Sequence, residues 1–541
     1  MREFKPRCIP AGLIRALLCL VRWLSVPVLA GFLVWLAFPP ASLWLFAWVG
    51  LAPLALRAVE SRRHNAFFQG WVSGAFFVYM AGHLTVKAHP PMIALSPLLG
   101  LTWGIFGLLV CSLRRRGYPM WLSCGAAWIT SESLKGFGPL AFPWLPLGSS
   151  QAAAPFLIQG ASVVGTAGIS CLLALVNGAL ADLWLTRRAG AKPGIGALLI
   201  LCLALLNGMV GALVLAGSDE FLKAGRGSVA GRKGSLRVAI VQPSVEGEGK
   251  WSGQHFDEIL KTHLDLSEQA LSSNPDLLIW PEGALGPAPG RAFEIVPLSV
   301  RKAAREMKVT ILMGTVHRDA IRGTSHNSAT IVSTTGGLTG RYDKMRLLPF
   351  AESVPRGLEF MAGPRVREYG YTPAARPPIL RWMPDLGGSE RPVGLGPFIC
   401  FEALFPETIR QLPMLGANML VHLSDEYWYR DPNASGQSVC LDTMRAVENR
   451  RSVARASNAG PSCFIDPWGR IAAMLKDETG RTCFIRGWVA AVVPLTDKKT
   501  VYSRLGDPVT PAGWMLLAIL LIARRTGRCT RCSGRTCSSQ S

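Results

Sequence analysis

Charged residues are scarce in this chain of 541 residues: Asp, Glu, Lys and Arg together make up 17%, whereas hydrophobic residues make up 49%. The mean hydropathy is +0.27, which is too apolar for an ordinary soluble enzyme. This composition excludes a purely soluble protein and indicates several membrane-spanning segments. No internal repeat is evident in the sequence.

Acidic residues are in the minority among the charges, with 35 Asp and Glu against 57 Lys and Arg, which gives a formal net charge of +22. Such an excess is compatible with nucleic acid or with anionic lipid as a partner, so the position of the basic residues must decide between them. Apolar stretches near the length of a membrane-spanning helix alternate with short connecting loops. They fall at about 23–38, 43–56, 66–86, 92–113, 120–134, 156–185, 195–216 and 511–523.

Basic clusters occupy every second loop between these stretches. They lie before the first stretch and after the second, fourth, sixth and eighth, and include Arg2, Lys5, Arg7, Arg57, Arg62, Arg63, Arg114, Arg115, Arg116, Arg187, Arg188, Lys192, Arg524, Arg525 and Arg528. Because Lys and Arg clusters stay on the cytoplasmic side, the alternation predicts two cytoplasmic termini and an external block at 217–508. The basic excess is therefore partly topological, and we expect no nucleic-acid partner.

A cleaved signal peptide over residues 1–38 is the alternative for the first apolar stretch. No Ala-x-Ala-like site follows that stretch, and Phe38-Pro39-Pro40 leads straight into another apolar segment. We therefore expect the first stretch to be retained. The domain organisation that follows is a transmembrane bundle at 1–216, a catalytic domain at 217–508, a last membrane helix at 509–525 and a basic cytoplasmic tail at 526–541.

The external block has the pattern of an α/β domain. Short apolar runs bounded by turn residues predict strands, and helical spacing lies between several of them. The predicted strands are 236–241, 277–280, 309–314, 329–334, 393–399 and 419–423, and the predicted helices are 254–272, 294–307, 403–413 and 437–451. Helices that flank sheets leave strand ends free to carry catalytic groups.

Three local segments of this block carry an acid, a cation and a thiol. Leu-Ile-Trp-Pro-Glu ends at Glu282, Arg-Tyr-Asp-Lys contains Lys344, and Gly-Pro-Phe-Ile-Cys-Phe-Glu contains Cys400. Cys400 follows an apolar run and precedes a predicted helix, whose N-terminus would favour a thiolate nucleophile. Glu282 at a strand end is a candidate general base, and the ammonium of Lys344 would stabilise a thiolate and an oxyanion. Taken singly, each is more often a structural cysteine, a turn glutamate or a surface lysine.

The three segments together resemble the nitrilase, or carbon–nitrogen hydrolase, superfamily, which forms acyl-enzyme thioesters with a Glu-Lys-Cys triad. That resemblance implies a four-layer α-β-β-α sandwich. The membrane segments and Phe142-Pro143-Trp144-Leu145, followed by Gly148 and Gln151, narrow the resemblance to the apolipoprotein N-acyltransferase family. Further positions match the family pattern and are expected to support the triad: Glu352, Glu402, Trp251 and Asn458.

The resemblance implies a reaction between two lipid-anchored substrates. Cys400 would take an acyl chain from a membrane phospholipid and pass it to the α-amine of a diacylglyceryl-cysteine at the N-terminus of an apolipoprotein. It also implies a multi-pass protein of the bacterial inner membrane with a periplasmic catalytic domain, a monomer without cofactor or metal. The long segment 353–392 would be a lid that excludes water, and Glu132, near a helix end, is a candidate for positioning or lipid contact.

Two other functions compete with this expectation. A membrane-tethered nitrilase-type amidase would hydrolyse an amide with the same triad, and a non-catalytic scaffold or transporter would carry paired acids in mid-helix, which this sequence lacks. The chain also departs from the family pattern at several positions, which puts substrate preference and turnover in question more than the reaction class. These positions are Gly283, Phe401, Ser149 and the segment 424–429.

The sequence contains 13 cysteine residues. Many lie in apolar segments, where they act as small hydrophobic residues. Cys463 and Cys483 fall on runs that could be neighbouring strands, but the sequence places no disulfide. In the tail, the Cys529-x-x-Cys532 pair and Cys537 lack a second pair or histidines, so a disordered basic tail is favoured over a zinc site.

Overall fold

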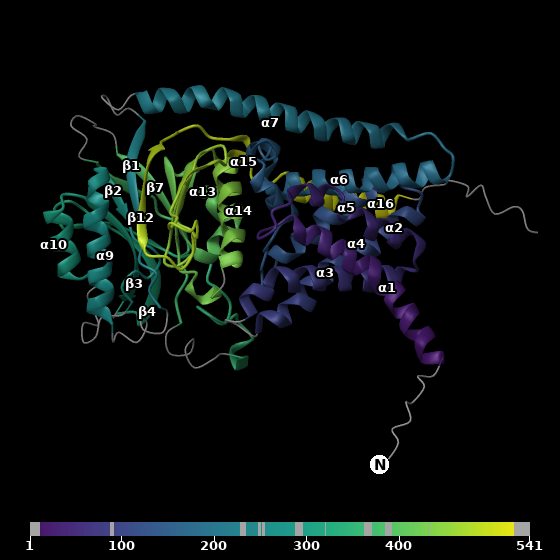
Figure 1. The fold of residues 1–541 in the computed structure, drawn as a ribbon, viewed down its shortest axis with the longest axis horizontal. Helices are drawn as coiled ribbons and strands as arrows, with labels where there is room; N and C mark the ends of the chain where they lie inside the picture. Colours follow the sequence, from purple (N-terminus) through teal and green to yellow (C-terminus); the bar gives the residue numbers. More distant parts are fainter. Residues whose placement is uncertain are drawn as a thin grey trace, which may run out of the picture.

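A computed structural model describes residues 11–86, 91–227, 234–246, 250, 255–286, 296–319, 321–361, 370–384, 392–430 and 432–523. The described residues form a helical half and an α/β half, which lie side by side along the long axis of the molecule (Figure 1). Trp251, the tail 526–541 and parts of the predicted lid, 362–369 and 385–391, lie outside the described residues.

The helical half follows the apolar stretches of the sequence. Its α-helices are α1 (Ala11–Leu36), α2 (Ala52–Glu60), α3 (Arg63–Val86), α4 (Pro91–Arg115), α5 (Met120–Ser133), α6 (Ala161–Arg188), α7 (Ile195–Gly227) and α16 (Val509–Ile522). Within the described chain, four segments are long and apolar enough to cross a membrane: Leu18–Leu36, Leu95–Arg115, Ala161–Arg188 and Ile195–Asp219. The predicted stretch 43–56 divides into the 3-10 helix η1 (Trp44–Trp48) and the short α2. The count of about eight spans stays a prediction.

Helices α3 and α4 are held together by facing glycines. Each carries a Gly-x-x-x-Gly pair, Gly70 with Gly74 and Gly100 with Gly104. A Cβ atom at Gly70 would lie 2.2 Å from the carbonyl oxygen of Trp103 on α4, which is far inside van der Waals contact. Small residues are what allow two helices to approach this closely where lipid offers no hydrophobic driving force.

The α/β half contains two six-stranded sheets packed face to face. The first sheet has the strand order β12-β1-β2-β3-β4-β5, and the second has the order β11-β10-β9-β8-β7-β6. The first sheet is built from β1 (Ser235–Gln242), β2 (Leu277–Ile279), β3 (Thr310–Asp319), β4 (Thr324–Val332), β5 (Leu338–Asp343) and β12 (Gly487–Pro494). The second is built from β6 (Leu380–Trp382), β7 (Val393–Ile399), β8 (Met419–Ser424), β9 (Ser452–Ser457), β10 (Cys463–Ile465) and β11 (Ile471–Met474).

Three apolar clusters hold these sheets in a four-layer arrangement. One cluster lies between the two sheets and includes Ile279, Ile399 and Leu423. A second lies between the first sheet and helices α9 (Phe256–Ala270) and α10 (Leu298–Glu306). A third covers the other face of the second sheet, together with α14 (Pro432–Asn449). Figure 1 shows α9 and α10 at the outer end and α14 beside the helical half, which confirms the predicted order of layers, α-β-β-α.

Helix α14 attaches the α/β half to the helical half through a buried polar contact. Gly165 has φ 67° and ψ 179°, which breaks the helical ladder near the start of α6. The N–H of the next residue, Thr166, donates to Glu448 Oε1 on α14 at 2.8 Å, and the Thr166 hydroxyl donates to the same oxygen at 2.6 Å. Arg445 lies 3.1 Å from the other oxygen of Glu448. These contacts fix the α/β half against α6.

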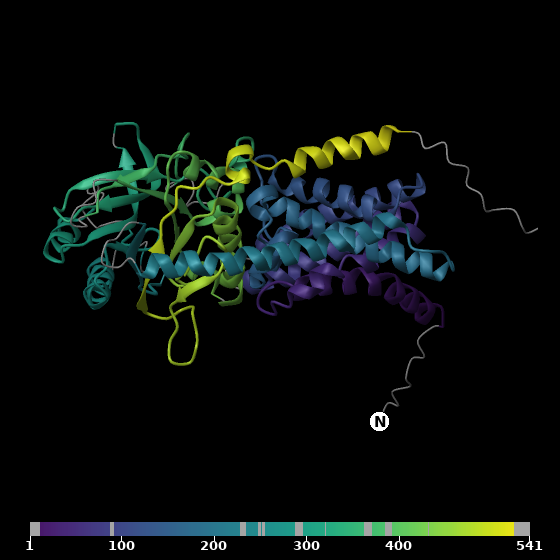
Figure 2. The same ribbon diagram turned by 90° about the horizontal axis from the view of Figure 1, so that it is seen from above.

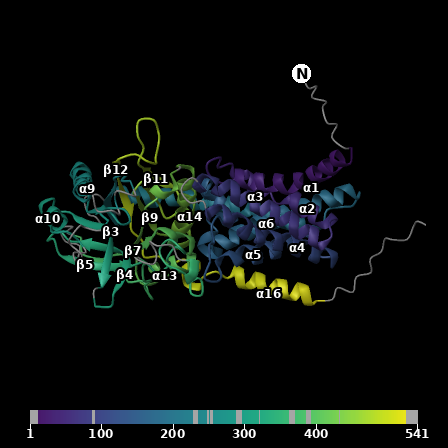
Figure 3. The ribbon, with the colours of Figure 1, turned by 90° about the horizontal axis from the view of Figure 1, so that it is seen from below.

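Two further helices define the outline of the molecule. Helix α7 runs along both halves, as two perpendicular views show (Figures 1 and 2). Helix α16, which returns from the α/β half, lies against the outside of the helical half (Figure 3). The indole N–H of Trp514 on α16 donates to Ser133 Oγ on α5 at 3.0 Å.

Candidate active site

Cys400 lies where β7 ends, in a strained turn between the strand and a short 3-10 helix. Its φ of 49° is in the left-handed region that non-glycine residues rarely adopt. The following element, η8 (Cys400–Leu404), is a five-residue 3-10 helix, and the predicted helix 403–413 is broken into α12 (Pro406–Ile409) and α13 (Gln411–Met414). The expected continuous helix is therefore wrong.

The thiol of Cys400 is not stabilised as a thiolate in this resting arrangement. Burial, and next to it the negative charge of Glu282, raise the pKa of the Cys400 thiol well above its ordinary value, although Lys344 acts in the opposite direction. A five-residue 3-10 helix supplies too few aligned peptides to offset that cost. The direction of this shift runs against the predicted helix-stabilised thiolate, so a base would be needed to remove the proton of this thiol.

Glu282 follows β2, in the position expected from the sequence, and the residue is 8% exposed. Gly314 on the adjacent strand β3 permits this turn, because a Cβ atom there would lie 2.6 Å from Glu282 Cα. Glu282 Oε2 accepts from the backbone N–H of Asp425 at 2.9 Å, and Oε1 accepts from the side-chain amide of Asn327 at 2.7 Å. The carboxylate is thus fixed close enough to Cys400 for its negative charge to raise the pKa of the thiol.

Lys344 directly follows β5, on the loop that the sequence predicts, and its side chain is 1% exposed. Its Nζ lies 2.8 Å from Glu352 Oε1 and 3.4 Å from Glu282 Oε1. Burial alone would lower the pKa of Lys344, but the charges of Glu352 and Glu282 outweigh it and hold the pKa well above its ordinary value. The structure therefore gathers a permanently charged ammonium, two carboxylates and the Cys400 thiol.

Glu402 is fully buried and links the two turns that carry Lys344 and Cys400. Its Oε1 accepts from Met345 N at 2.8 Å, its Oε2 accepts from Ile399 N at 2.7 Å, and both oxygens accept from Tyr342 Oη at 2.9 and 2.8 Å. Burial raises the pKa of Glu402, and the backbone N–H donors oppose that shift. The carboxylate therefore ties the residue after Lys344 to the residue before Cys400.

Asn458 lies behind Glu282 and orders a neighbouring loop. Its side-chain amide donates to Asp425 Oδ1 at 2.9 Å and to Val245 O at 2.8 Å, and its oxygen accepts from Val245 N at 2.9 Å. Asp425 in turn supports Glu282 through its backbone N–H. Asn458 thus acts on the site through Asp425.

Two residues of the site were missed by sequence reasoning. Lys250 is buried, and its Nζ donates to Asp425 Oδ2 at 2.7 Å and to the carbonyl of Glu282 at 2.9 Å. Asn327, on β4, bridges Glu282 and Glu352 with one amide nitrogen. The signal available for Lys250 was its place beside Trp251, whereas Asn327 lies in a polar strand with no local motif.

The helical half contacts the residue that follows Cys400 through aromatic rings. Phe142, in the loop after α5, packs against Phe401 with ring centroids 5.7 Å apart, and Phe401 packs against Phe405 at 5.2 Å. Glu132, the candidate acid of α5, accepts from the backbone N–H of Leu147 at 2.7 Å and from the indole of Trp128 at 3.2 Å. These contacts give Glu132 a structural task in holding the loop.

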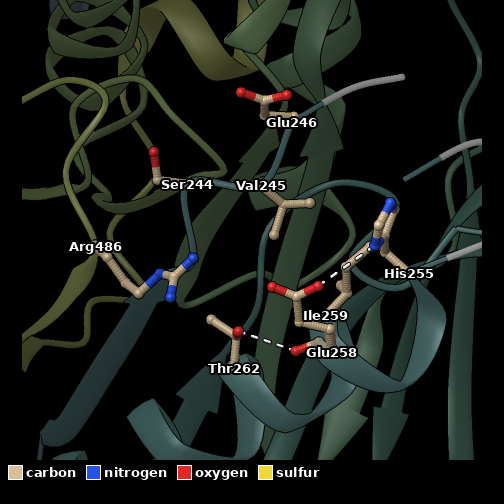
Figure 4. A pocket seen from close by; sticks show the side chains of 8 residues that line it. All are labelled: Ser244, Val245, Glu246, His255, Glu258, Ile259, Thr262 and Arg486. Carbon is tan, nitrogen blue, oxygen red and sulfur yellow. Dashed lines mark hydrogen bonds and ion pairs between the residues drawn. The ribbon is translucent and has the colours of Figure 1, made fainter. Parts of the chain in front are cut away.

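Two hollows lie beside the site, and the described residues that line them do not include Glu282, Lys344 or Cys400. One of about 450 Å³ is lined by Glu246, Tyr427, Arg430 and Phe484. The other, of about 310 Å³, contains a His255–Glu258 pair at 3.4 Å with the guanidinium of Arg486 opposite (Figure 4). Among the described residues no group of three or more His, Cys, Asp or Glu is arranged to hold a metal, and Cys463 and Cys483 are free thiols.

The chain matches two family profiles, one in each half. Residues 30–179 match the apolipoprotein N-acyltransferase N-terminal domain, and residues 237–486 match the carbon-nitrogen hydrolase family. The apolipoprotein N-acyltransferase of Geobacter metallireducens is 29% identical over 92% of this chain and 95% of its own length. That of Shewanella oneidensis is 28% identical over 90% of this chain and 92% of its own length.

Solved structures are similar to about half of this chain. Saccharomyces cerevisiae Nit3, of the nitrilase superfamily, is 18% identical with a TM-score of 0.36, over 48% of this chain and 91% of its own. An amidase from Nesterenkonia sp. is 20% identical with a TM-score of 0.36, over 52% of this chain and 97% of its own. The two profiles and the full-length relatives together show that this chain is similar to apolipoprotein N-acyltransferases over about nine tenths of its length.

Proposed function

We propose that this protein is an apolipoprotein N-acyltransferase, which moves an acyl chain from a membrane phospholipid through a thioester on Cys400 to the N-terminal α-amine of a diacylglyceryl-cysteine lipoprotein. The observation that carries the proposal is the buried group of Lys344, Glu282 and Glu352, whose charges act on the Cys400 thiol. This group lies in a domain fastened to apolar helices, as a reaction between two lipid-anchored substrates requires.

The first half-reaction forms the thioester. Glu282 takes the proton of the Cys400 thiol, and the resulting thiolate attacks the ester carbonyl of the phospholipid. The negative charge that develops on the carbonyl oxygen is stabilised by the ammonium of Lys344 and by backbone N–H groups at the start of η8. When the tetrahedral intermediate collapses, the C–O bond breaks, and the leaving alkoxide takes the proton from Glu282. The products are the acyl-enzyme and a lysophospholipid.

The second half-reaction repeats these steps with an amine. The α-amine of the acceptor attacks the thioester carbonyl while Glu282 accepts one of its protons. The C–S bond then breaks, and the Cys400 thiolate regains the proton from Glu282. Throughout both steps Glu352 holds Lys344 in place, and Glu402 fixes the two turns that carry Lys344 and Cys400. Trp251 and Asn458 are proposed as further supporting residues.

The membrane half serves to hold both substrates beside the site. Helices at 1–216 and 509–525 would place the domain at 217–508 on the periplasmic face of the inner membrane, with the termini in the cytoplasm. Tethering both substrates to one surface removes most of the entropic cost of bringing them together. Phe360, 78% exposed on the segment of the predicted lid, is proposed to meet acyl chains and exclude water from the thioester. The enzyme is proposed to act as a monomer.

Transfer between defined substrates tests this function. Purified protein in detergent with phospholipid and a diacylglyceryl-cysteine lipopeptide is expected to yield N-acylated lipopeptide and lysophospholipid in equal amounts. The variant Cys400→Ala is expected to yield neither product. Cys400→Ala with undiminished transfer would refute the assignment of the nucleophile. Release of free acid or ammonia from an amide substrate, without lipopeptide acylation, would favour the amidase.

A further inference from the structure

A buried charged cluster lies directly behind the nucleophile. His422 lies on β8, where it pairs in register with Phe398 of the neighbouring strand β7. Asp442 on α14 and Arg455 on β9 approach it from two other elements, and all three side chains are at most 1% exposed. Burying charged groups is costly unless they are paired, and none of these three takes part in the mechanism above.

The contacts of this cluster form a chain that ends on Cys400. Asp442 Oδ2 lies 2.6 Å from Arg455 Nη1 and 2.8 Å from His422 Nδ1. These two nitrogens are themselves 2.7 Å apart, since both converge on the same oxygen. The other ring nitrogen, His422 Nε2, lies 3.3 Å from the carbonyl oxygen of Cys400. Arg455 is anchored on its far side by Glu426.

The direction of the last contact is fixed by its partner. A carbonyl oxygen can only accept a hydrogen bond, so we assign a proton to Nε2, which is then the donor in this contact. The imidazole cannot swing away, because it stacks on Phe398 with ring centroids 4.4 Å apart and an interplanar angle of 16°. His422 therefore holds the carbonyl of Cys400 with a rigid donor.

Holding this carbonyl also orients the next backbone N–H. A trans peptide is planar, and its C=O and N–H point in opposite directions. The oxygen of the Cys400–Phe401 peptide points at His422, so the Phe401 N–H points away from it. The N–H groups of the first helical turn have no partner within the helix. Because Cys400 has a strained φ of 49°, its peptide keeps this direction only while its surroundings hold it.

We propose that His422 is a positioning residue that fixes the Cys400–Phe401 peptide, so that the Phe401 N–H is presented to the oxyanion formed at Cys400. Asp442 and Arg455 hold the imidazole for this task. The proposal rests on the acyl-transfer chemistry proposed above and adds to it the device that directs its backbone donor. The sulfur itself is held independently by β7 and by the bond from Ile399 N to Glu402.

Two substitutions of His422 separate this role from simple packing. His422→Phe keeps a ring on Phe398 but has no donor, whereas His422→Gln offers an amide N–H near the place of Nε2. In His422→Phe the kcat for acylation of Cys400 by p-nitrophenyl butyrate is expected to fall about 100-fold or more, the loss typical of one oxyanion donor. The KM of His422→Phe is expected to stay within about threefold of that of the unsubstituted protein. The kcat of His422→Gln is expected to be at least about tenfold higher than that of His422→Phe.

Alkylation of Cys400 by iodoacetamide, followed by mass spectrometry of its peptide, supplies the decisive comparison. This displacement forms no oxyanion, so its rate in His422→Phe is expected to stay within about threefold of the unsubstituted protein. The control is His263→Gln, which removes another fully buried histidine, on α9, and is expected to leave both rates unchanged. Equal losses of alkylation and acylation, or no loss of acylation, would overturn the proposal.

The same two readouts keep this proposal apart from the proposed function. Acylation by a simple ester needs only the nucleophile and its oxyanion donors, whereas the function requires transfer to a lipopeptide. If p-nitrophenyl butyrate acylates Cys400 of the unsubstituted protein but no acyl chain is transferred to the lipopeptide, only the proposed function is refuted. If p-nitrophenyl butyrate acylates His422→Phe at the rate of the unsubstituted protein, only the positioning role is refuted.

Discussion

Replacing Glu402 by Gln tests how the site is held together, because this one carboxylate receives donors from both catalytic turns. The three closest donors are Tyr342 Oη, Met345 N and Ile399 N, all within 2.9 Å. Gln keeps one acceptor oxygen but turns an amide N–H toward a donor on the other side. A buried donor without an acceptor costs about 1–3 kcal/mol. For a domain of this size that corresponds to a fall in Tm of about 2–12 °C.

The effect of Glu402→Gln on activity should exceed its effect on binding. If the turns bearing Lys344 and Cys400 relax, kcat for thioester formation should fall about tenfold or more, since about 1.4 kcal/mol of lost transition-state stabilisation is a factor of ten. The control is Glu407→Gln, five residues further along, where an exposed carboxylate lies 3.6 Å from Arg346. That exposed pair is worth less than about 1 kcal/mol. Equal Tm and kcat for the two variants would refute the bracing role of Glu402.

Three further perturbations follow from the structure. Glu282→Gln removes the proposed base, while burial still holds the pKa of the Cys400 thiol above its ordinary value. The thiolate fraction, and with it the rate of alkylation by iodoacetamide, should therefore rise about tenfold per pH unit from pH 7 to 9. An alkylation rate that does not change with pH would contradict this. Thr166→Val removes the hydroxyl bonded to Glu448 and should lower the free energy of unfolding in detergent by about 1–2 kcal/mol. Gly70→Ala drives a Cβ into the backbone of α4 and should lower stability by about 1–3 kcal/mol.

Matched controls separate these effects from general damage. Thr186→Val makes the same change on α6, where the hydroxyl bonds within its own helix to Asp182 O. Gly217→Ala adds a methyl group on α7 where nothing lies within 4 Å. Thermal unfolding of the four variants should leave both controls near the unsubstituted protein. A control that loses as much stability as its partner would refute the corresponding contact.

The sequence predicts the parts of this site that carry local motifs. Glu282, Lys344 and Cys400 each lie where a predicted strand or turn ends, because an apolar run followed by a polar residue marks the edge of a buried sheet. All six predicted strands are present. Their catalytic roles remain predictions, whereas their spatial neighbourhood is a finding of the structure.

The remainder depends on tertiary contacts that have no local signal. Strand β9 was missed because its Ser and Arg residues interrupt the apolar ones, so that it contains no apolar run. Asn327 gains its task only when β4 lies beside the Glu282 and Glu352 turns. The expected helix dipole at Cys400 failed because Pro406 follows so closely that the first turn stays a short 3-10 helix.

The most direct test of the account is a mass measurement on the intact protein. After incubation with a phospholipid of defined acyl chain and no acceptor, the protein should gain the mass of one acyl group, located on the peptide that contains Cys400. Hydroxylamine should remove this mass, and addition of lipopeptide should transfer it. Acylation at another residue, or lipopeptide acylation by a protein whose Cys400 stays unmodified, would contradict the account.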